Sequence, residues 1–185
     1  IQALTTAQAE ALTTAQIAAL STTQLAAMET VDLAALSTTQ LRALASSQVA
    51  GLTTTQVANL TTTQVAGLAS TQLGGLTSAQ GAALTTAQLA GLSSAQIATL
   101  STNAARGLTT AAIAALDTNQ IKGLTTAQIA QLSTAQVAAI ETADLAQMTT
   151  AQIPGFTTAQ IANMTTTQTA NLGTAQIRAL TSARP

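Results

Sequence analysis

The chain contains no cysteine, histidine, tryptophan or tyrosine, and Phe156 is its one aromatic residue. The absence of His and Cys removes the ligand sets that are typical of zinc and haem sites. A single aromatic side chain excludes the stacking platforms of single-stranded nucleic-acid binders. Hydroxyl residues without a histidine also lack the usual general base of a serine hydrolase. We therefore expect no enzymatic activity, no cofactor and no catalytic or metal centre of these kinds.

Charge and long apolar runs are scarce as well. Charged residues make up 6% of the chain, against about 25% in an ordinary soluble domain. The net charge of −1 offers no basic surface to a phosphate backbone, so we expect no nucleic-acid partner. At least one hydroxyl residue recurs every eight positions, and no segment approaches the roughly 18 apolar residues of a membrane-spanning helix. We expect no transmembrane segment.

What the chain does contain is an eight-residue repeat without insertions or deletions. Stepping by eight from Leu4 to Leu180 meets an apolar residue at all 23 positions, and 18 of these are Leu. The typical unit reads Leu-Thr-Thr-Ala-Gln-Ile-Ala-Ala, and we letter its positions a to h. Such periodicity predicts one quasi-one-dimensional array over residues 1–185, in which neighbouring units bury each other. Both ends fall inside a unit, so we expect a segment of a longer array.

The order of residues within the octad predicts a helix start. Position b is Ser or Thr in 17 of 23 units, and position e is Gln in 18 of 23. A hydroxyl residue followed three positions later by Gln is a capping box, and apolar residues at a and f flank it as a hydrophobic staple. The clearest predicted capping pairs are Thr13 with Gln16, Ser37 with Gln40, and Thr125 with Gln128.

These caps predict an all-α solenoid of very short helices, one per octad, running from about c to g or h. One long helix does not fit, because an eight-residue step rotates the anchors off any common face. Helices this short are unstable alone and must pack through a and f. Thr and Ile also favour strands, which leaves a β-solenoid as the alternative. The predicted core includes Ile17, Leu20, Leu36, Leu60, Ile97, Leu100, Leu116, Ile129 and Leu132.

Positions g and h carry secondary signals. The charged residues at g mark the solvent face, and Pro154 at g predicts a local irregularity. Gly at h is typical of a helix that ends in the left-handed conformation. The charged residues are Glu10, Arg42, Arg106, Lys122 and Arg178, and the glycines are Gly51, Gly67, Gly91, Gly107, Gly123 and Gly155.

Two octads carry paired carboxylates, Glu29 with Asp32 and Glu141 with Asp144. One hypothesis is a calcium site or an acid/base pair. The alternative is a variant cap, in which acidic groups favour the positive end of a helix. We favour the variant cap, because calcium usually takes six or more oxygen ligands and no other acidic residue is near in the sequence.

Position c is Ser or Thr in every unit. The simplest interpretation is that these hydroxyls supplement the caps or bond to the backbone of an adjacent unit. They could instead carry O-linked glycan, or form a regular Thr-rich face that organises water as an ice-binding surface would. Whether the hydroxyls are bonded internally or displayed on one face distinguishes these hypotheses.

The octads Leu-Ser/Thr-Thr-Ala/Thr-Gln-Ile/Val-Ala-Ala/Gly, with occasional Glu-Thr-x-Asp units, resemble repeats in very large secreted or surface-attached proteins of Gram-negative bacteria, often labelled adhesin-like. The resemblance implies an extracellular stalk, fibre or matrix role and brings no catalytic residues. We therefore expect a structural fibre segment that self-associates or continues into more of the same array, with filaments as one outcome. The alternative is a Thr-rich surface that binds a cell surface, glycan or ice.

Overall fold

The computed structural model describes residues 4–182, which are helical and contain no strand. Up to α20 each octad forms one helix of four to six residues, apart from a 3-10 turn, η1, and α21 extends over nine residues into the last octad. The prediction of an all-helical solenoid is confirmed, and the alternative β-solenoid is not supported. The elements are α1 (Thr6–Glu10), α2 (Thr14–Ala18), α3 (Thr22–Ala26), α4 (Thr30–Ala35), α5 (Thr38–Arg42), α6 (Ser46–Ala50), α7 (Thr54–Asn59), α8 (Thr62–Gly67), α9 (Ser70–Leu73), α10 (Ser78–Ala83), α11 (Thr86–Ala90), α12 (Ser94–Thr99), α13 (Thr102–Gly107), α14 (Thr110–Ala114), α15 (Thr118–Gly123), α16 (Thr126–Gln131), α17 (Thr134–Ala138), α18 (Thr142–Gln147), η1 (Ile153–Gly155), α19 (Thr158–Ala162), α20 (Thr166–Ala170) and α21 (Thr174–Ser182).

Most of the helices begin at a capping box, and a corner of extended residues leads from one helix to the next. At α16 the Thr125 hydroxyl accepts from the backbone N–H of Gln128 at 3.2 Å. The Gln128 side-chain oxygen in turn accepts from the Thr125 backbone N–H at 2.8 Å. Beyond the helix, Leu132 (φ −63°, ψ 143°) and Ser133 (φ −70°, ψ 160°) are extended and redirect the chain into α17. The same reciprocal cap is present at Thr13 with Gln16 and at Ser37 with Gln40.

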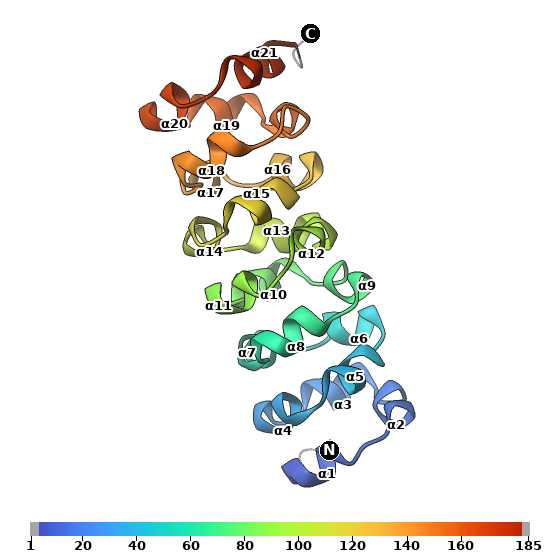
Figure 1. Ribbon diagram of the computed structural model, residues 1–185. Coiled ribbons are helices and arrows are strands. Elements are labelled where there is room, and N and C mark those ends of the chain that lie inside the picture. Colours follow the sequence, from blue (N-terminus) through green and yellow to red (C-terminus); the bar gives the residue numbers. More distant parts are fainter. Residues whose placement is uncertain (1–3, 183–185) are drawn as a thin grey trace.

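The helices form three columns, because each one packs mainly against the third helix along the chain. The first column runs α1, α4, α7, α10, α13, α16, η1 and α21. The second runs α2, α5, α8, α11, α14, α17 and α19, and the third runs α3, α6, α9, α12, α15, α18 and α20. One turn of the solenoid, here called a layer, therefore consists of three octads. Figure 1 shows these layers stacked along one long axis, with the two ends of the chain at opposite ends of the rod.

The core is a continuous apolar stack along the axis of the rod. It is built from positions a and f, and Ile17, Ile97 and Ile129 at position f are fully buried. The anchors Leu36, Leu60, Leu100, Leu116 and Leu132 are at most 5% exposed. Leu20, which we expected in the core, is only partly buried. It lies in the first layer, so no layer beneath it covers its side chain.

The glycines at position h do not end helices in the left-handed conformation, as we had expected. No residue in the described range has a positive φ. At Gly107 and Gly123, glycine is required instead by the close approach of the preceding layer. A Cβ on Gly123 would lie 2.4 Å from the carbonyl oxygen of Ser94, and one on Gly107 would lie 2.0 Å from that of Ser78. Both contacts join h to position c of an octad in the preceding layer, so Gly at h sets how closely two layers can stack.

Two further local expectations concern Pro154 and the charged residues at g. The unit of Pro154 forms the 3-10 turn η1 in place of an α-helix, because proline lacks the backbone donor that a helix needs late in its course. The side chains of the five charged residues at g are exposed: Glu10, Arg42, Arg106, Lys122 and Arg178.

Candidate functional site

A row of glutamine side chains at position e, here called the glutamine seam, joins each layer to the one before it. Gln88 illustrates the geometry: its Nε2 donates to the carbonyl oxygens of Val57 at 2.9 Å and Leu60 at 2.7 Å. Its Oε1 accepts from the Thr85 backbone N–H at 2.8 Å. One amide therefore caps its own helix and also bonds to the corner between two helices of the preceding layer.

The same bond recurs in every layer that has another layer before it. Fifteen glutamines donate to carbonyl oxygens 28 to 31 residues earlier, and all but Gln96 are buried. They are Gln40, Gln48, Gln56, Gln64, Gln72, Gln80, Gln88, Gln96, Gln120, Gln128, Gln136, Gln152, Gln160, Gln168 and Gln176. The accepting carbonyls belong to positions f and g at the end of a helix and to position a in the corner that follows it, where backbone oxygens lack the regular helical partner.

Capping alone does not explain this choice of residue. Glu caps as well as Gln in this motif and also interacts favourably with the helix dipole. Nevertheless position e is Gln in 18 units and Glu in none. The side-chain N–H₂ is what Glu lacks, and the interlayer bonds need it. This bias is visible in the sequence, although the predicted capping role needs only the side-chain oxygen.

Three kinds of exception interrupt the seam. Gln8, Gln16 and Gln24 lie in the first layer and are exposed. Ala104 and Ala112 replace Gln in α13 and α14. In α13 the hydroxyl of Ser101 takes over part of the lost contact and donates to the Leu76 carbonyl oxygen at 2.7 Å, the acceptor that a glutamine at 104 would reach.

The third exception is the pair of octads with two carboxylates. Asp32 of α4 and Asp144 of α18 occupy the seam position, and each accepts a hydrogen bond from a threonine hydroxyl, that of Thr6 and that of Thr118. The two octads lie in different columns, so the structure does not join their carboxylates into one site. No group of three or more acidic residues that could hold a metal occurs within residues 4–182.

The hydroxyls at position c are displayed and not bonded internally, contrary to our simplest interpretation. In the described part of the chain, only those of Thr6 and Thr118 form a hydrogen bond. Position c is the first residue of each helix and lies exposed or half-buried at the surface, where the Thr38 side chain packs against Gly67 of the next layer. The capping oxygen comes from position b instead, as at Thr125.

The second column collects these hydroxyls on one surface, here called the threonine face. Its seven position-c threonines recur once per layer and lie exposed or half-buried on consecutive layers. Nearly all of the residues around them at d, g and h are Ala, Gly or Thr. Arg42 is the single charged residue in the seven helices of this column. The seven threonines are Thr14, Thr38, Thr62, Thr86, Thr110, Thr134 and Thr158.

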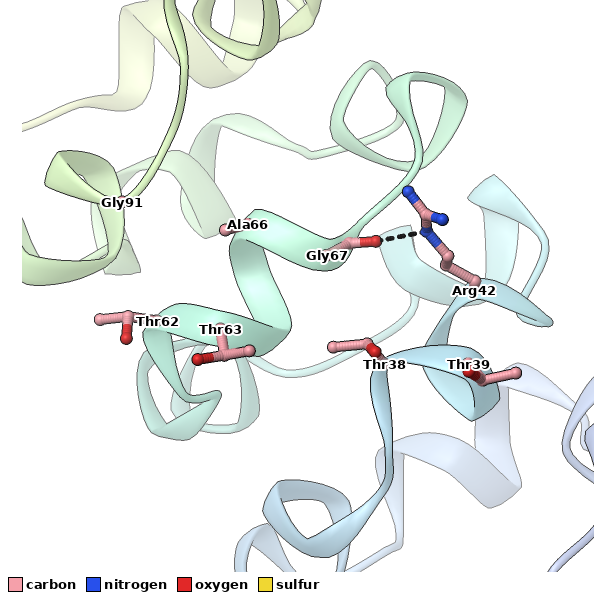
Figure 2. A pocket seen from close by; sticks show the side chains of 8 residues that line it. All are labelled: Thr38, Thr39, Arg42, Thr62, Thr63, Ala66, Gly67 and Gly91. Carbon is pink, nitrogen blue, oxygen red and sulfur yellow. Dashed lines mark hydrogen bonds between the residues drawn. The ribbon is translucent and has the colours of Figure 1, made fainter.

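A surface hollow of about 600 Å³ interrupts the threonine face between α5 and α8 (Figure 2). Thr38, Thr39, Thr62 and Thr63 line it together with Arg42, two small residues of α8, and Gly91, which follows α11. The Arg42 Nε donates to the carbonyl oxygen of Gly67 at 2.6 Å and so ties two layers together from outside. No helix in the described residues has the length and apolar character to cross a membrane.

A family model described as the ALTTAQ repeat matches residues 1–30, 25–62, 65–102, 105–134 and 137–174. Together these segments cover nearly the whole array. No curated protein and no solved structure matches the chain.

The two roles of the seam amide can be separated by replacing Gln with Glu. Gln88 of α11 and Gln16 of α2 sit in nearly identical helices with the same cap, but only Gln88 has a layer before it. In Gln88→Glu the cap is kept while a carboxylate faces two carbonyl oxygens. We expect this change to lower the free energy of unfolding by about 3 kcal/mol or more, the usual cost of an uncompensated buried charge. Gln16→Glu should change it by less than about 0.5 kcal/mol.

Urea denaturation followed by circular dichroism at 222 nm measures both variants. Equal losses for Gln88→Glu and Gln16→Glu would show that glutamine acts in capping alone.

Proposed function

We propose, from the premise that the chain belongs to the ALTTAQ repeat family, that it is a structural segment of an extracellular fibre or stalk. Its role is to keep the parts of the protein at its two ends a fixed distance apart and to bear mechanical force, and this role needs no catalytic residue. The proposal rests on the fold, because a solenoid of identical layers provides a rod whose length is set by the number of octads.

The observation that carries the proposal is the regularity of the glutamine seam. Fifteen amides repeat one interlayer contact from Gln40 to Gln176. Each layer therefore rests on the preceding one through the same hydrogen bonds and the same apolar core. Stacked helices lie roughly 8–10 Å apart, so the 23 octads extend roughly 60–75 Å. A stalk needs this kind of length-independent construction.

The complementary faces of successive layers support assembly along the axis. In the first layer the seam amides of Gln8, Gln16 and Gln24 are exposed and donate to no carbonyl of an earlier layer. In the last layers Met164 and Leu172 are only partly buried. Further octads, or the first layer of a second copy, would cover these surfaces with the contact that the rod already uses. The low charge of the chain offers little repulsion against such association.

An extracellular or cell-surface location is part of the same proposal. It is supported by the resemblance of the octads to those of large secreted or surface-attached bacterial proteins. The fold is also held by packing and hydrogen bonds without any cysteine. It therefore needs no disulfide to persist outside a cell.

Electron microscopy of the purified chain at rising concentration tests the fibre proposal. We expect rods of uniform width that lengthen as concentration increases. The triple variant Gln8→Glu, Gln16→Glu and Gln24→Glu should stay short, because carboxylates would face the carbonyl oxygens of the incoming layer. A matched control, Thr62→Glu with Thr86→Glu, changes the lateral surface and should lengthen like the wild type.

Compact spherical particles would contradict the stalk. Rods that thicken instead of lengthening, and that stop doing so in the Thr62→Glu control, would show lateral association in place of end-to-end growth.

The threonine face favours a second function, recognition of an extended surface such as ice. Seven threonines stand in register on an almost uncharged surface, and none of their hydroxyls is bonded to another described residue. A hydroxyl without an internal partner is free to donate and accept with ordered water. The regular spacing along the column repeats such positions once per layer.

Ice recrystallisation in the presence of the protein tests this second function. If the threonine face binds ice, the wild type inhibits crystal growth, and Thr62→Lys with Thr86→Lys abolishes the inhibition because bulky charges interrupt the face. The control, Ser94→Lys with Thr126→Lys, alters position c in the other two columns and should retain it. Absence of inhibition by the wild type, or equal loss in both variants, would contradict the idea.

A further inference from the structure

Asp32 occupies the seam position of α4 and has a buried side-chain oxygen without a hydrogen-bond partner. The residue is 2% exposed. Its Oδ1 accepts from the Thr6 hydroxyl at 3.0 Å, whereas its Oδ2 is buried and forms no hydrogen bond. No other buried side-chain oxygen or nitrogen in the described residues lacks a partner. Burying an unpaired polar atom is costly, so this oxygen calls for a partner that residues 4–182 do not provide.

The register of the seam indicates surroundings that are rich in oxygen for Asp144. In the register of the seam, the side chain at position e faces the carbonyl oxygens 28 and 31 residues earlier. For Asp144, which is 6% exposed, these belong to Leu116 and Ile113. A glutamine places N–H groups between these carbonyls, whereas an aspartate is one methylene shorter and offers only acceptor oxygens on this side. The hydroxyl of Thr118 supplies a further oxygen.

A second carboxylate accompanies each seam aspartate. Glu occurs at position b in two octads only, as Glu29 and Glu141, and these are the two octads with Asp at e. Neither glutamate caps its helix. Two carboxylates three residues apart in one helical turn repel each other. None of the four forms a salt bridge within the described residues that would offset this repulsion.

From this arrangement we propose that each Glu-Thr-x-Asp octad binds a calcium ion at the interface between two layers. Calcium is a hard cation that prefers carboxylate, carbonyl and hydroxyl oxygens, with water completing its coordination. Asp32 and Glu29 in α4, and Asp144 and Glu141 in α18, neutralise the charge of the ion. The ion bridges the aspartate to the backbone of the preceding layer and so takes the place of the missing glutamine N–H₂.

The consequence is a rod in which two layer contacts depend on calcium, while the other seam contacts do not. The two octads, those of Asp32 and Asp144, lie fourteen repeats apart along the chain. Loss of calcium would weaken the contact between α1 and α4 and that between α15 and α18. Stiffness and stability of the array would then respond to calcium at two defined points.

Calcium titration of the full chain, prepared with EDTA, tests the proposal by calorimetry and by thermal melting at 222 nm. We expect about two ions per chain, with a dissociation constant of roughly 10⁻⁴ to 10⁻³ M for sites with so few charges. The melting temperature should rise by at least about 3 °C between EDTA and saturating calcium. Magnesium should give a smaller rise, because it holds its own water and demands octahedral geometry.

The matched variant, Asp32→Gln with Asp144→Gln, restores the seam residue of the other octads and is expected to fold. It should bind no calcium, and its melting temperature should exceed that of the calcium-free wild type and be the same in EDTA and calcium. Asp32→Gln alone should halve the stoichiometry. The proposal would be overturned if calcium produced neither a binding heat nor a rise in melting temperature in the wild type. It would also be overturned if the double variant bound calcium and gained the same rise in melting temperature as the wild type.

Discussion

The hydrogen bonds from glutamine Nε2 to the backbone of the preceding layer are the interaction on which the rest of this structure depends. A helix of about five residues has too few internal bonds to exist alone. The corners that link such helices also leave carbonyl groups without partners. Gln88 stabilises both features. Its Oε1 accepts from the Thr85 backbone N–H and caps its own helix, and its Nε2 donates to the carbonyl oxygens of Val57 and Leu60. Formation of each short helix and its stacking on the preceding layer are therefore coupled.

This coupling explains how the molecule tolerates variation. At α13 the seam glutamine is replaced by Ala104, and the Ser101 hydroxyl donates to the Leu76 carbonyl in its place. The neighbouring α10 carries Gly81 at a core position, where an added Cβ would lie 2.2 Å from the Ala104 carbonyl oxygen. Small side chains on both helices thus allow a closer approach. The packing of α13 on α10 is kept, and with it the turn of three octads.

Much of this construction could be predicted from the sequence, because it is local. The Thr125 and Gln128 cap and the apolar alternation of a and f are written within one octad, and they predict short helices with a shared core. The number of octads per turn depends on contacts between octads in successive layers, which no single unit encodes. The roles of Gly123 and of the hydroxyls at position c were predicted wrongly for the same reason, because both depend on contacts between layers. Gly123 is needed where the Ser94 backbone of the preceding layer comes close, and the hydroxyls at c lie at the surface.

The most direct test of the central role of the seam is the exchange of glutamine side-chain amide protons, followed by NMR on protein labelled with ¹⁵N at glutamine Nε2. The seam predicts fifteen slowly exchanging side-chain amides, while those of Gln8, Gln16 and Gln24 in the first layer exchange rapidly. Uniformly rapid exchange of all glutamine side chains would mean that the layers are not held through these amides, and would contradict that role.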